Sequence, residues 1–557
     1  MRIKTILLSM LAGLAFVGCT SGDDVDPNGG NSPEGTRYLT VNLVSSDATR
    51  AEYENGTDDE NKVTSVRFYF FNSAGGAANV KLKGTEYVNY FDWTAPTTKP
   101  GTPAEADVEK ILSATIIIDT SKEDKLPARV AAIVNPTEAG QSRSLSELQN
   151  LCADYAYVVP KKDGENKDDL TTPGKFVMFN SVYRNDGKAV HTTVITKDNL
   201  QDTPDKALAN PVKIYVERSV AKVSVELAAG FENGKLALKT KDGAGNEIPL
   251  LVDGKQVYLE ILGWDLAAET NYGRLVKRIN PSWDDDGLFG SHRSFWAVNF
   301  MNNELYTNRN VYDKSYDDIK TSPAFLYTNE NAQKADTQGG TAGPADKSTK
   351  VILAGKLMDS EGNALNIVRH AGAHFVDNDT YTNLRTNILR QLGMTQKYYY
   401  AVGTDRKQID IDDIEIVNTE TQEKEESDNN CYVYAQLTKD AKAKTWYDSE
   451  EENAQPISHD VINTALKDKD KVSWPLVWNN GMTYYFYEIN HLEGYTGVVR
   501  NHVYKTRVTK ILGLGTPVYN PGDIIYPEKP DPKQNFIAAE VQILSWRIIS
   551  NDNVLEW

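Results

Sequence analysis

The chain has 557 residues, which allows about two to four domains with sizeable cores. Its 60 Lys and Arg residues are outnumbered by 78 Asp and Glu residues, and the formal net charge of −18 argues against a nucleic acid as a partner. Three cysteines cannot form a disulfide framework, while 29 tyrosines, 38 glycines and 22 prolines are typical of a strand-rich protein with many turns.

Residues 1–19 have the pattern of a secretory signal peptide, with a short basic start and an apolar run. The run ends in residues 16–19, which resemble a bacterial lipobox, where the signal is cut before the cysteine and Cys19 becomes the lipidation site. Residues 21–26, which include three aspartates, resemble the short acidic signals that send lipoproteins of Bacteroidia to the outer face of the outer membrane. A plain signal peptide that contains a cysteine, followed by a solvated spacer, is the alternative.

A tether and then a strand follow the signal peptide. Residues 20–36 cannot bury enough apolar surface to fold and are expected to be a flexible tether. Residues 38–44 alternate between apolar and polar side chains, with Leu39, Val41 and Leu43 on one face. This alternation predicts a strand with one buried face at the start of the folded body.

Arg50 and Ala51 follow this strand in a polar segment, residues 45–59. An arginine-specific protease would find an exposed bond between the two residues. Cleavage there would separate the body from its lipid anchor and from its first strand, so residues 20–50 are predicted to be a propeptide.

Most of the remaining chain is predicted to form strands. Short runs rich in Val, Ile, Tyr and Phe lie between Gly, Pro, Asn or Asp residues. Their irregular spacing, without alternating helices, favours antiparallel β-sandwiches. A domain break near residue 211 divides the body into an N-terminal domain, 51–211, a C-terminal domain, 212–530, and a tail, 531–557. The predicted strands are residues 64–71, 114–119, 129–134, 175–180, 212–225, 257–264 and 350–357.

Helices are predicted at three places. A capping box at residues 144–147 begins a helix whose apolar face includes Leu148 and Cys152. Cys152 is therefore interpreted as a small core residue rather than a reactive thiol. Residues 383–392 and 461–466 are the other two predicted helices.

The sequence contains no complete motif for catalysis or metal binding. His370 and His374 have the spacing of two ligands on one helix face, but a glycine lies between them and no further ligand accompanies them. Residues 284–287 and 410–413 lack the alternating ligands of a calcium loop and are interpreted as solvated turns. There is no phosphate-binding loop or nucleophile elbow, and residues 513–515 lack the rest of a dinucleotide fingerprint. We therefore predict no catalytic residue, no metal and no cofactor, and we do not expect an enzyme.

Two aromatic runs, residues 398–400 and 484–487, keep a second interpretation open. Exposed aromatic rings could form a stacking platform for sugars. In a strand, successive side chains point to opposite faces, so about half of each run is expected in the core. A surface glycan-binding lipoprotein is thus the alternative to a structural subunit.

The C-terminal tail is strand-like and ends in an apolar residue. Four prolines between residues 521 and 532 predict an extended linker that detaches the tail from the preceding domain. Two sets of apolar residues lie on opposite phases of the strand, so periodicity leaves the buried face and the register open. The residues predicted to fill a groove are Val541, Ile543, Leu544, Trp546, Ile548, Val554 and Trp557.

The two terminal strands together indicate strand exchange. Loss of the first strand would leave a groove with unpaired backbone groups and exposed apolar surface, which demands a replacement strand. The tail of a second copy could supply it. Such a head-to-tail contact does not close on itself, so it builds a filament.

Several segments carry a resemblance to a known family: residues 129–136, 217–223, 263–264, 293–296, 327–331 and 497–504. With the lipobox, they make the chain similar to the type V fimbrillins of Bacteroidia, and most like the shaft subunits of the short, Mfa-type fimbriae of Porphyromonas. Arg218, Lys222, Arg500 and His502 in these segments are expected to anchor strand ends or loops rather than to catalyse.

The resemblance implies two transthyretin-like antiparallel β-sandwich domains with a few short helices. It also implies export through the periplasm as an outer-membrane lipoprotein, trimming by an arginine-specific protease and assembly into a cell-surface fimbrium. The expected partners are other copies of the chain, accessory anchor and tip subunits, and host or bacterial surface receptors. Because a tip subunit needs no donor strand, the tail favours the shaft, whereas a tip or anchor adhesin of the same fold is the alternative.

Overall fold

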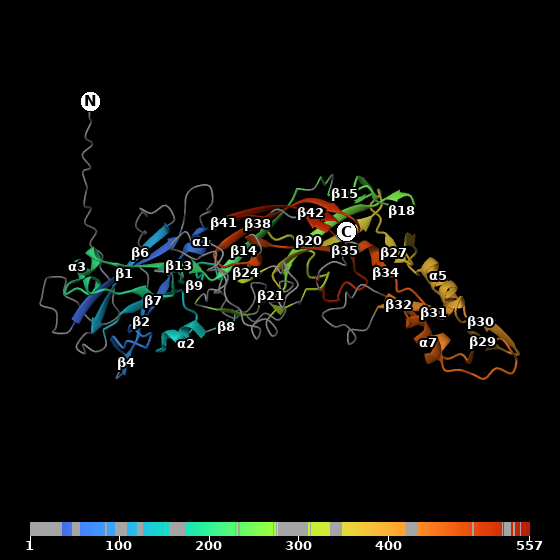
Figure 1. Ribbon diagram of the computed structural model, residues 1–557, viewed down its shortest axis with the longest axis horizontal. Coiled ribbons are helices and arrows are strands. Elements are labelled where there is room, and N and C mark those ends of the chain that lie inside the picture. Colours follow the sequence, from blue (N-terminus) through green and yellow to red (C-terminus); the bar gives the residue numbers. More distant parts are fainter. Residues whose placement is uncertain are drawn as a thin grey trace, which may run out of the picture.

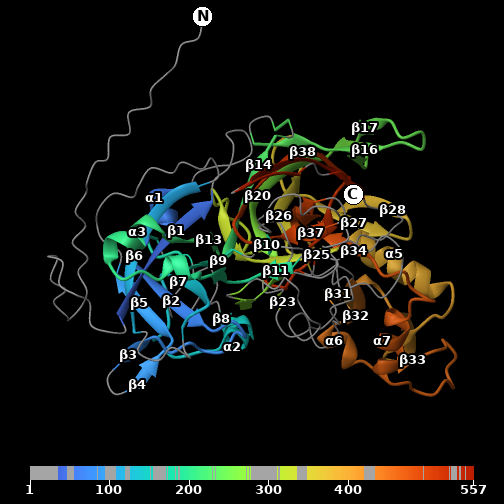
Figure 2. The same ribbon diagram turned by 60° about the vertical axis from the view of Figure 1, so that its left-hand side comes forward.

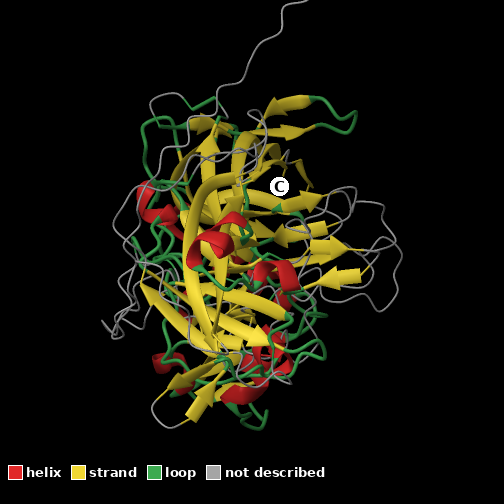
Figure 3. Ribbon diagram, turned by 90° about the vertical axis from the view of Figure 1, so that its left-hand side faces the viewer, coloured by secondary structure: helices red, strands yellow, loops and turns green. Residues whose placement is uncertain are grey.

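The computed structural model describes residues 36–46, 56–83, 86–94, 108–119, 126–150, 152–154, 171, 173–181, 183–185, 188–228, 230–231, 234–270, 272–274, 276, 310–311, 314–334, 348–418, 433–492, 495–525, 527, 536–538, 541–545 and 547–556. Cys19, Arg50, Ala51, Trp546 and Trp557 lie outside these residues, as do the predicted turn at 284–287 and the segment 293–296. Strands dominate the described chain and the helices are short (Figure 3), which confirms the predicted all-β fold.

An eight-stranded sheet organises the N-terminal part of the chain (Figure 1). Its order is β5-β2-β7-β9-β13-β1-β6, with β12 paired to β7. The pair of β1 and β13 is parallel, and the other described pairs are antiparallel. The strands are β1 (Thr36–Ser46), β2 (Ser65–Phe71), β5 (Tyr90–Thr94), β6 (Val108–Asp119), β7 (Arg129–Val134), β9 (Met178–Asn180), β12 (Thr193–Val194) and β13 (Val212–Arg218).

Two sheets face each other across a common core in the second part of the chain. Tyr504 and Val508 from one sheet pack with Leu353 and Tyr485 from the other. The first sheet contains β14 (Val220–Leu227), β16 (Lys239–Lys241), β17 (Glu247–Pro249), β24 (Leu326–Asn329), β38 (His502–Leu512), β40 (Phe536–Ala538), β41 (Val541–Ser545) and β42 (Arg547–Glu556). The second contains β15 (Leu236–Ala237), β20 (Tyr258–Ala267), β26 (Lys350–Met358), β35 (Met482–Glu488) and β39 (Thr516–Pro517).

A third hydrophobic core, which the sequence did not predict, lies at the end of the molecule far from the first sheet (Figure 1). Ile388, Trp446 and Leu466 are among its fully or almost fully buried members. Its elements are β27 (Asn366–His370), β28 (Ala373–Asp377), α5 (Thr382–Gly393), β29 (Tyr399–Val402), β30 (Asp405–Gln408), η5 (Ile411–Asp413), β31 (Ile414–Asn418), β32 (Val433–Leu437), α6 (Lys439–Lys442), β33 (Trp446–Tyr447), α7 (His459–Lys467) and β34 (Leu476–Trp478).

The three predicted helices are confirmed as α2 (Leu145–Asn150), α5 and α7. The capping box of α2 forms as expected: the backbone N–H of Ser144 donates to Glu147 Oε2 over 2.6 Å, and the Glu147 N–H donates to Ser144 Oγ over 3.2 Å. The placement of Cys152 on this helix was wrong. The helix ends at Asn150, and Cys152 begins strand β8 (Cys152–Asp154), which pairs with β22 (Tyr272–Arg274).

The predicted strand 212–225 is two strands that belong to two sheets. β13 pairs with β1 and β9, whereas β14 pairs with β24 and β38. The chain changes sheet at Ser219, directly after the buried Arg218. We therefore propose the division between the two parts at Ser219 rather than at residue 211.

None of the helices in the described part of the chain combines the length and the apolar composition that a membrane span requires. The remaining elements of the fold are short. These elements are α1 (Asp58–Asn61), β3 (Lys81–Lys83), β4 (Glu86–Val88), β10 (Tyr183–Asn185), β11 (Lys188–Val190), η2 (Lys197–Asn199), α3 (Pro204–Ala209), β18 (Leu251–Val252), β19 (Lys255–Gln256), β21 (Glu269–Thr270), β23 (Asn310–Val311), β25 (Asn331–Lys334), β36 (Asn490–Leu492), η7 (Asn479–Gly481) and β37 (Tyr495–Val498).

Candidate functional site

The predicted first strand, residues 38–44, is confirmed within β1, and it occupies an inner place in the sheet. β1 lies between β13 and β6, so a backbone ladder holds it on each edge. Leu39 is opposite Ile116, and Val41 is opposite Ala114 on β6 and Val212 on β13. Without β1, these neighbours would have no strand between them.

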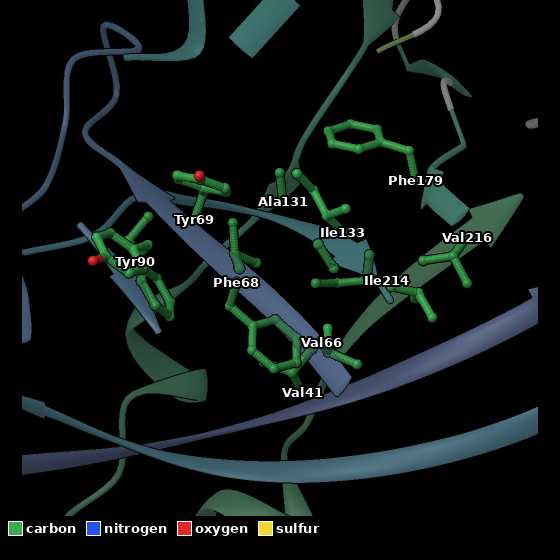
Figure 4. Packing of buried hydrophobic residues seen from close by; sticks show 14 of the residues in the cluster. Val41, Val66, Phe68, Tyr69, Tyr90, Ala131, Ile133, Phe179, Ile214 and Val216 are labelled. Atoms are coloured by element: carbon green, nitrogen blue, oxygen red, sulfur yellow. The ribbon is translucent and has the colours of Figure 1, made fainter. Parts of the chain in front are cut away.

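Both faces of β1 are buried at its centre, whereas the sequence predicted one buried face. Leu39 and Val41 are fully buried in the core, where Val41 lies near Val66 (Figure 4). Thr40 points to the opposite face and is also fully buried, and its Oγ1 lies 3.0 Å from Thr115 Oγ1. The helix α3 packs against both β1 and β6. The side chain of Leu43 lies outside the described part of the chain.

Helix α1 follows the predicted cleavage segment and is held by a buried carboxylate. Glu60 is almost fully buried, and its Oε1 accepts hydrogen bonds from Lys222 Nζ, over 2.8 Å, and from the Tyr327 hydroxyl. Its Oε2 accepts the backbone N–H of Thr57 over 2.7 Å. Burial by itself raises the pKa of Glu60, but the bonds from Lys222, Tyr327 and Thr57 outweigh it, so the pKa lies below the ordinary value of 4.5.

Arg218 joins the same helix to the second part of the chain. Its Nε donates to the carbonyl oxygen of Glu60 over 3.3 Å, and its guanidinium also donates to Asn61 Oδ1. Its Nη1 and its backbone N–H both donate to Asn501 Oδ1, each over 3.2 Å. The expectation that Arg218 and Lys222 act as structural anchors is confirmed.

A second buried group lies at the start of β38. Arg500 Nε forms an ion pair with Glu330 Oε2 over 2.7 Å, and the two side chains are only 1% and 2% exposed. The His502 imidazole hydrogen-bonds through Nδ1 to the Arg500 carbonyl oxygen over 2.8 Å, which confirms both residues as anchors. His491 Nδ1 lies 2.9 Å from the Tyr504 hydroxyl, and burial raises the pKa of Tyr504.

Three of the segments that carry the family resemblance therefore meet at the junction of the two parts: residues 217–223, 327–331 and 497–504. Glu60 and Asn61, which were not predicted from the sequence, complete this junction. The sequence does contain a signal for this helix, because Thr57 and Glu60 have the spacing of a capping box, and they form one at the start of α1.

The prolines predicted a detached tail, and this prediction was wrong. The backbone of the tail pairs with β38, antiparallel through β41 and parallel through β42, so the tail covers one edge of the second part. Ser545 lies opposite His502, and Leu544 opposite Val503. Of the predicted donor residues, Val541, Ile543 and Leu544 lie in β41, and Ile548 and Val554 lie in β42.

The other candidate groups take structural roles. Tyr484, Tyr485, Phe486 and Tyr487 are all buried, not half of them as predicted, because β35 lies between β26 and β39 with a core on each face. In the other run, residues 398–400, the first and last tyrosines are buried and the middle one is half-buried.

The two candidate metal patterns do not form ligand sets. His370 and His374 lie on the hairpin of β27 and β28 rather than on a helix. Asp410 caps η5, and Asp413 forms an ion pair with Lys444. Among the described residues, no three His, Cys, Asp or Glu side chains gather in a way that could hold a metal ion.

Comparisons with known proteins give one family and several distant structures. Residues 477–552 match the model of the C-terminal region of the major fimbrial subunit protein type IV, fimbrillin. No curated protein sequence matches the chain.

Three solved structures illustrate the distant likeness. A fimbrilin, FimA, of Porphyromonas gingivalis W83 is 12% identical, over 93% of this chain and 96% of that one, with a TM-score of 0.32. A fimbrial assembly protein of Parabacteroides distasonis is 11% identical, over 60% and 91%, with a TM-score of 0.28. The tip fimbrial protein Mfa3 of P. gingivalis, truncated at its C-terminus, is 13% identical, over 61% and 83%, with a TM-score of 0.26. In its C-terminal region the chain is thus similar to major fimbrial subunits, which are structural proteins and not enzymes.

Proposed function

We propose that the chain is the shaft subunit of an adhesive surface fimbrium and polymerises by donor-strand exchange after proteolytic trimming. The precursor is an outer-membrane lipoprotein anchored through Cys19, and an arginine-specific protease cuts it between Arg50 and Ala51. Anchor and tip subunits complete the fimbrium, which binds host or bacterial receptors. The fimbrillin-like C-terminal region supports a fimbrial role.

The inner place of β1 is the observation that carries this proposal. Loss of β1 would open the sheet between β13 and β6 and expose the core around Ile116 and Val212. An incoming strand with three apolar side chains would gain about 1.5–3 kcal/mol for each, before the cost of ordering the tail. The tail of a second copy can supply this strand only if it leaves β38.

The test is to treat the precursor, residues 20–557, with an arginine-specific protease and to follow its N-terminal sequence and its size by chromatography. We expect a new N-terminus at Ala51 and oligomers that grow with concentration. A matched precursor that lacks residues 541–557 should be cut equally well and remain monomeric. A cut subunit with an intact tail that stays monomeric would contradict the shaft role and favour the glycan-binding or tip alternative.

A further inference from the structure

The place of Thr40 in the first sheet selects a short hydroxyl side chain. Thr40 is fully buried, and the helix α3, whose Ala207 is also fully buried, packs against β1 and β6. The Thr40 hydroxyl lies 3.0 Å from that of Thr115, its partner across the antiparallel ladder. A long side chain would not fit this fully buried place unless its neighbours moved, and an apolar one would lose the bond to Thr115.

The positions on either side of Thr40 require apolar side chains, because Leu39 and Val41 face the core. A replacement strand therefore needs an apolar residue, a small hydroxyl residue and another apolar residue in succession. Within residues 541–557 this order occurs once, at Leu544, Ser545 and Trp546. The other phase of the tail, with Val541 and Ile543 inward, would bring Gln542 to the place of Thr40.

The sizes of the neighbouring side chains agree with this alignment. Trp546 would take the place of Val41, which is opposite Ala114 on β6. Ala114 is the smallest of the described core-facing residues of β6, the others being Ile116 and Ile118. Ile548 would then take the place of Leu43, and the donor would run as β1 does, parallel to β13 and antiparallel to β6.

We propose, on the basis of the function proposed above, that the donor tail of a second copy enters in a single register, with Ser545 in the place of Thr40 and hydrogen-bonded to Thr115. Leu544, Trp546 and Ile548 replace Leu39, Val41 and Leu43. The buried hydroxyl position thereby decides between two phases that hydrophobicity alone leaves equivalent.

The test is a cysteine pair in the full-length precursor. Residues opposite each other in an antiparallel pair have Cα atoms about 4.5–5.5 Å apart, within the range for a disulfide. Thr115→Cys combined with Ser545→Cys, trimmed and oxidised with copper phenanthroline, should give a ladder of covalent oligomers on a non-reducing gel. Thr115→Cys combined with Gln542→Cys is the matched pair for the other phase, and Thr115→Cys alone controls for Cys152 and Cys431.

The outcomes separate the register from the function. Chromatography under reducing conditions first establishes that each trimmed variant forms oligomers. A ladder from the pair with Ser545→Cys, and none from the pair with Gln542→Cys, is the expected result. Oligomers that cross-link only through Gln542→Cys would overturn the register and leave strand exchange intact. The absence of oligomers from the trimmed wild-type chain would overturn both.

Discussion

Buried charges in this molecule mark the places where distant segments of the chain meet. Arg218 contacts residues that precede it by more than 150 positions and Asn501, which follows it by 283. A buried cation of this kind is tolerated because each of its N–H groups can find an oxygen acceptor. Such side chains specify which segments meet more than they add net stability.

The Arg500–Glu330 pair gives a prediction about stability. Arg500→Ala would leave the buried Glu330 carboxylate without the guanidinium and should lower the free energy of unfolding by about 3–5 kcal/mol. Chemical denaturation of the two proteins measures this difference. Lys206→Ala is the matched control, because the Lys206–Asp202 pair is 59% and 51% exposed and should contribute about 0–1 kcal/mol. Equal effects of the two substitutions would contradict the role of burial.

Glu60 gives a prediction about pH. Its pKa is lower in the folded chain than the ordinary value of 4.5, so its ionised form stabilises the fold at neutral pH. This contribution is lost as the pH falls through the folded pKa. Wild type should therefore be more stable than Glu60→Gln at pH 7, and the difference in their free energies of unfolding should shrink as the pH falls from the ordinary pKa of 4.5 through the folded pKa. A difference that stays constant over this range would argue against an ionised Glu60.

At the scale of elements, two strands that lie close together leave no room for a side chain at some glycine positions. Gly497 in β37 has a φ of +96°, and a Cβ there would lie 2.0 Å from the carbonyl oxygen of Asn331. We expect Gly497→Ala to destabilise the chain by several kcal/mol, since backbone atoms of β25 would have to move. Gly403→Ala, at a φ of +64° with open space around it, should cost only about 1–2 kcal/mol. Thermal unfolding of both variants tests the comparison, and equal losses would contradict it.

The proposed role of β1 as a removable strand predicts that the effect of one substitution depends on trimming. Leu39→Ala should lower the free energy of unfolding of the precursor by about 2–5 kcal/mol, because Leu39 is fully buried. In the trimmed subunit, once β1 has left, the same substitution should have no effect. Val216→Ala in β13 is the control, since it should destabilise both forms. A trimmed subunit that forms oligomers but still loses stability through Leu39→Ala would count against the exchange, because β1 would then have kept its place.

Local sequence patterns predicted individual strands and helices better than they predicted which of these elements pack together. The alternation at residues 38–44 identified a strand, and the capping box at 144–147 identified a helix, because both signals lie within one turn or a few residues. The burial of Thr40 could not be predicted, since β1 packs against elements far along the chain, among them α3, more than 160 residues further on. The junction of Glu60 with Lys222 and Tyr327 likewise requires three segments to be brought together by the fold.

At the scale of the whole molecule, the first sheet, the sandwich and the third core follow one another along the long axis (Figure 1). The proposed site of exchange lies in the first sheet, while the tail pairs with β38 in the second part (Figure 2). A contact between copies made by this exchange would therefore join two different surfaces, the arrangement that extends indefinitely instead of closing into a dimer.

The third core predicts a region that opens independently. It has its own buried residues, so a cavity made within it should not spread to the first sheet. Ile388→Ala should increase amide hydrogen exchange in α5 and α7 and leave β2 and β7 unchanged. Ile214→Ala, in the core of the first sheet, should increase exchange in β2 and β7 and leave α5 and α7 unchanged. Uniform loss of protection in both variants would show a single cooperative unit.

The two ladders that hold β1 have a kinetic consequence. Cutting the chain after Arg50 breaks one covalent bond but none of the hydrogen bonds that tie β1 to β13 and β6. A nicked subunit would thus keep its own strand as a bound peptide and stay inert until that peptide dissociates or is displaced. Nicked subunits would then accumulate after proteolysis. The lifetime of the nicked state, rather than the activity of the protease, would determine the rate at which the filament lengthens.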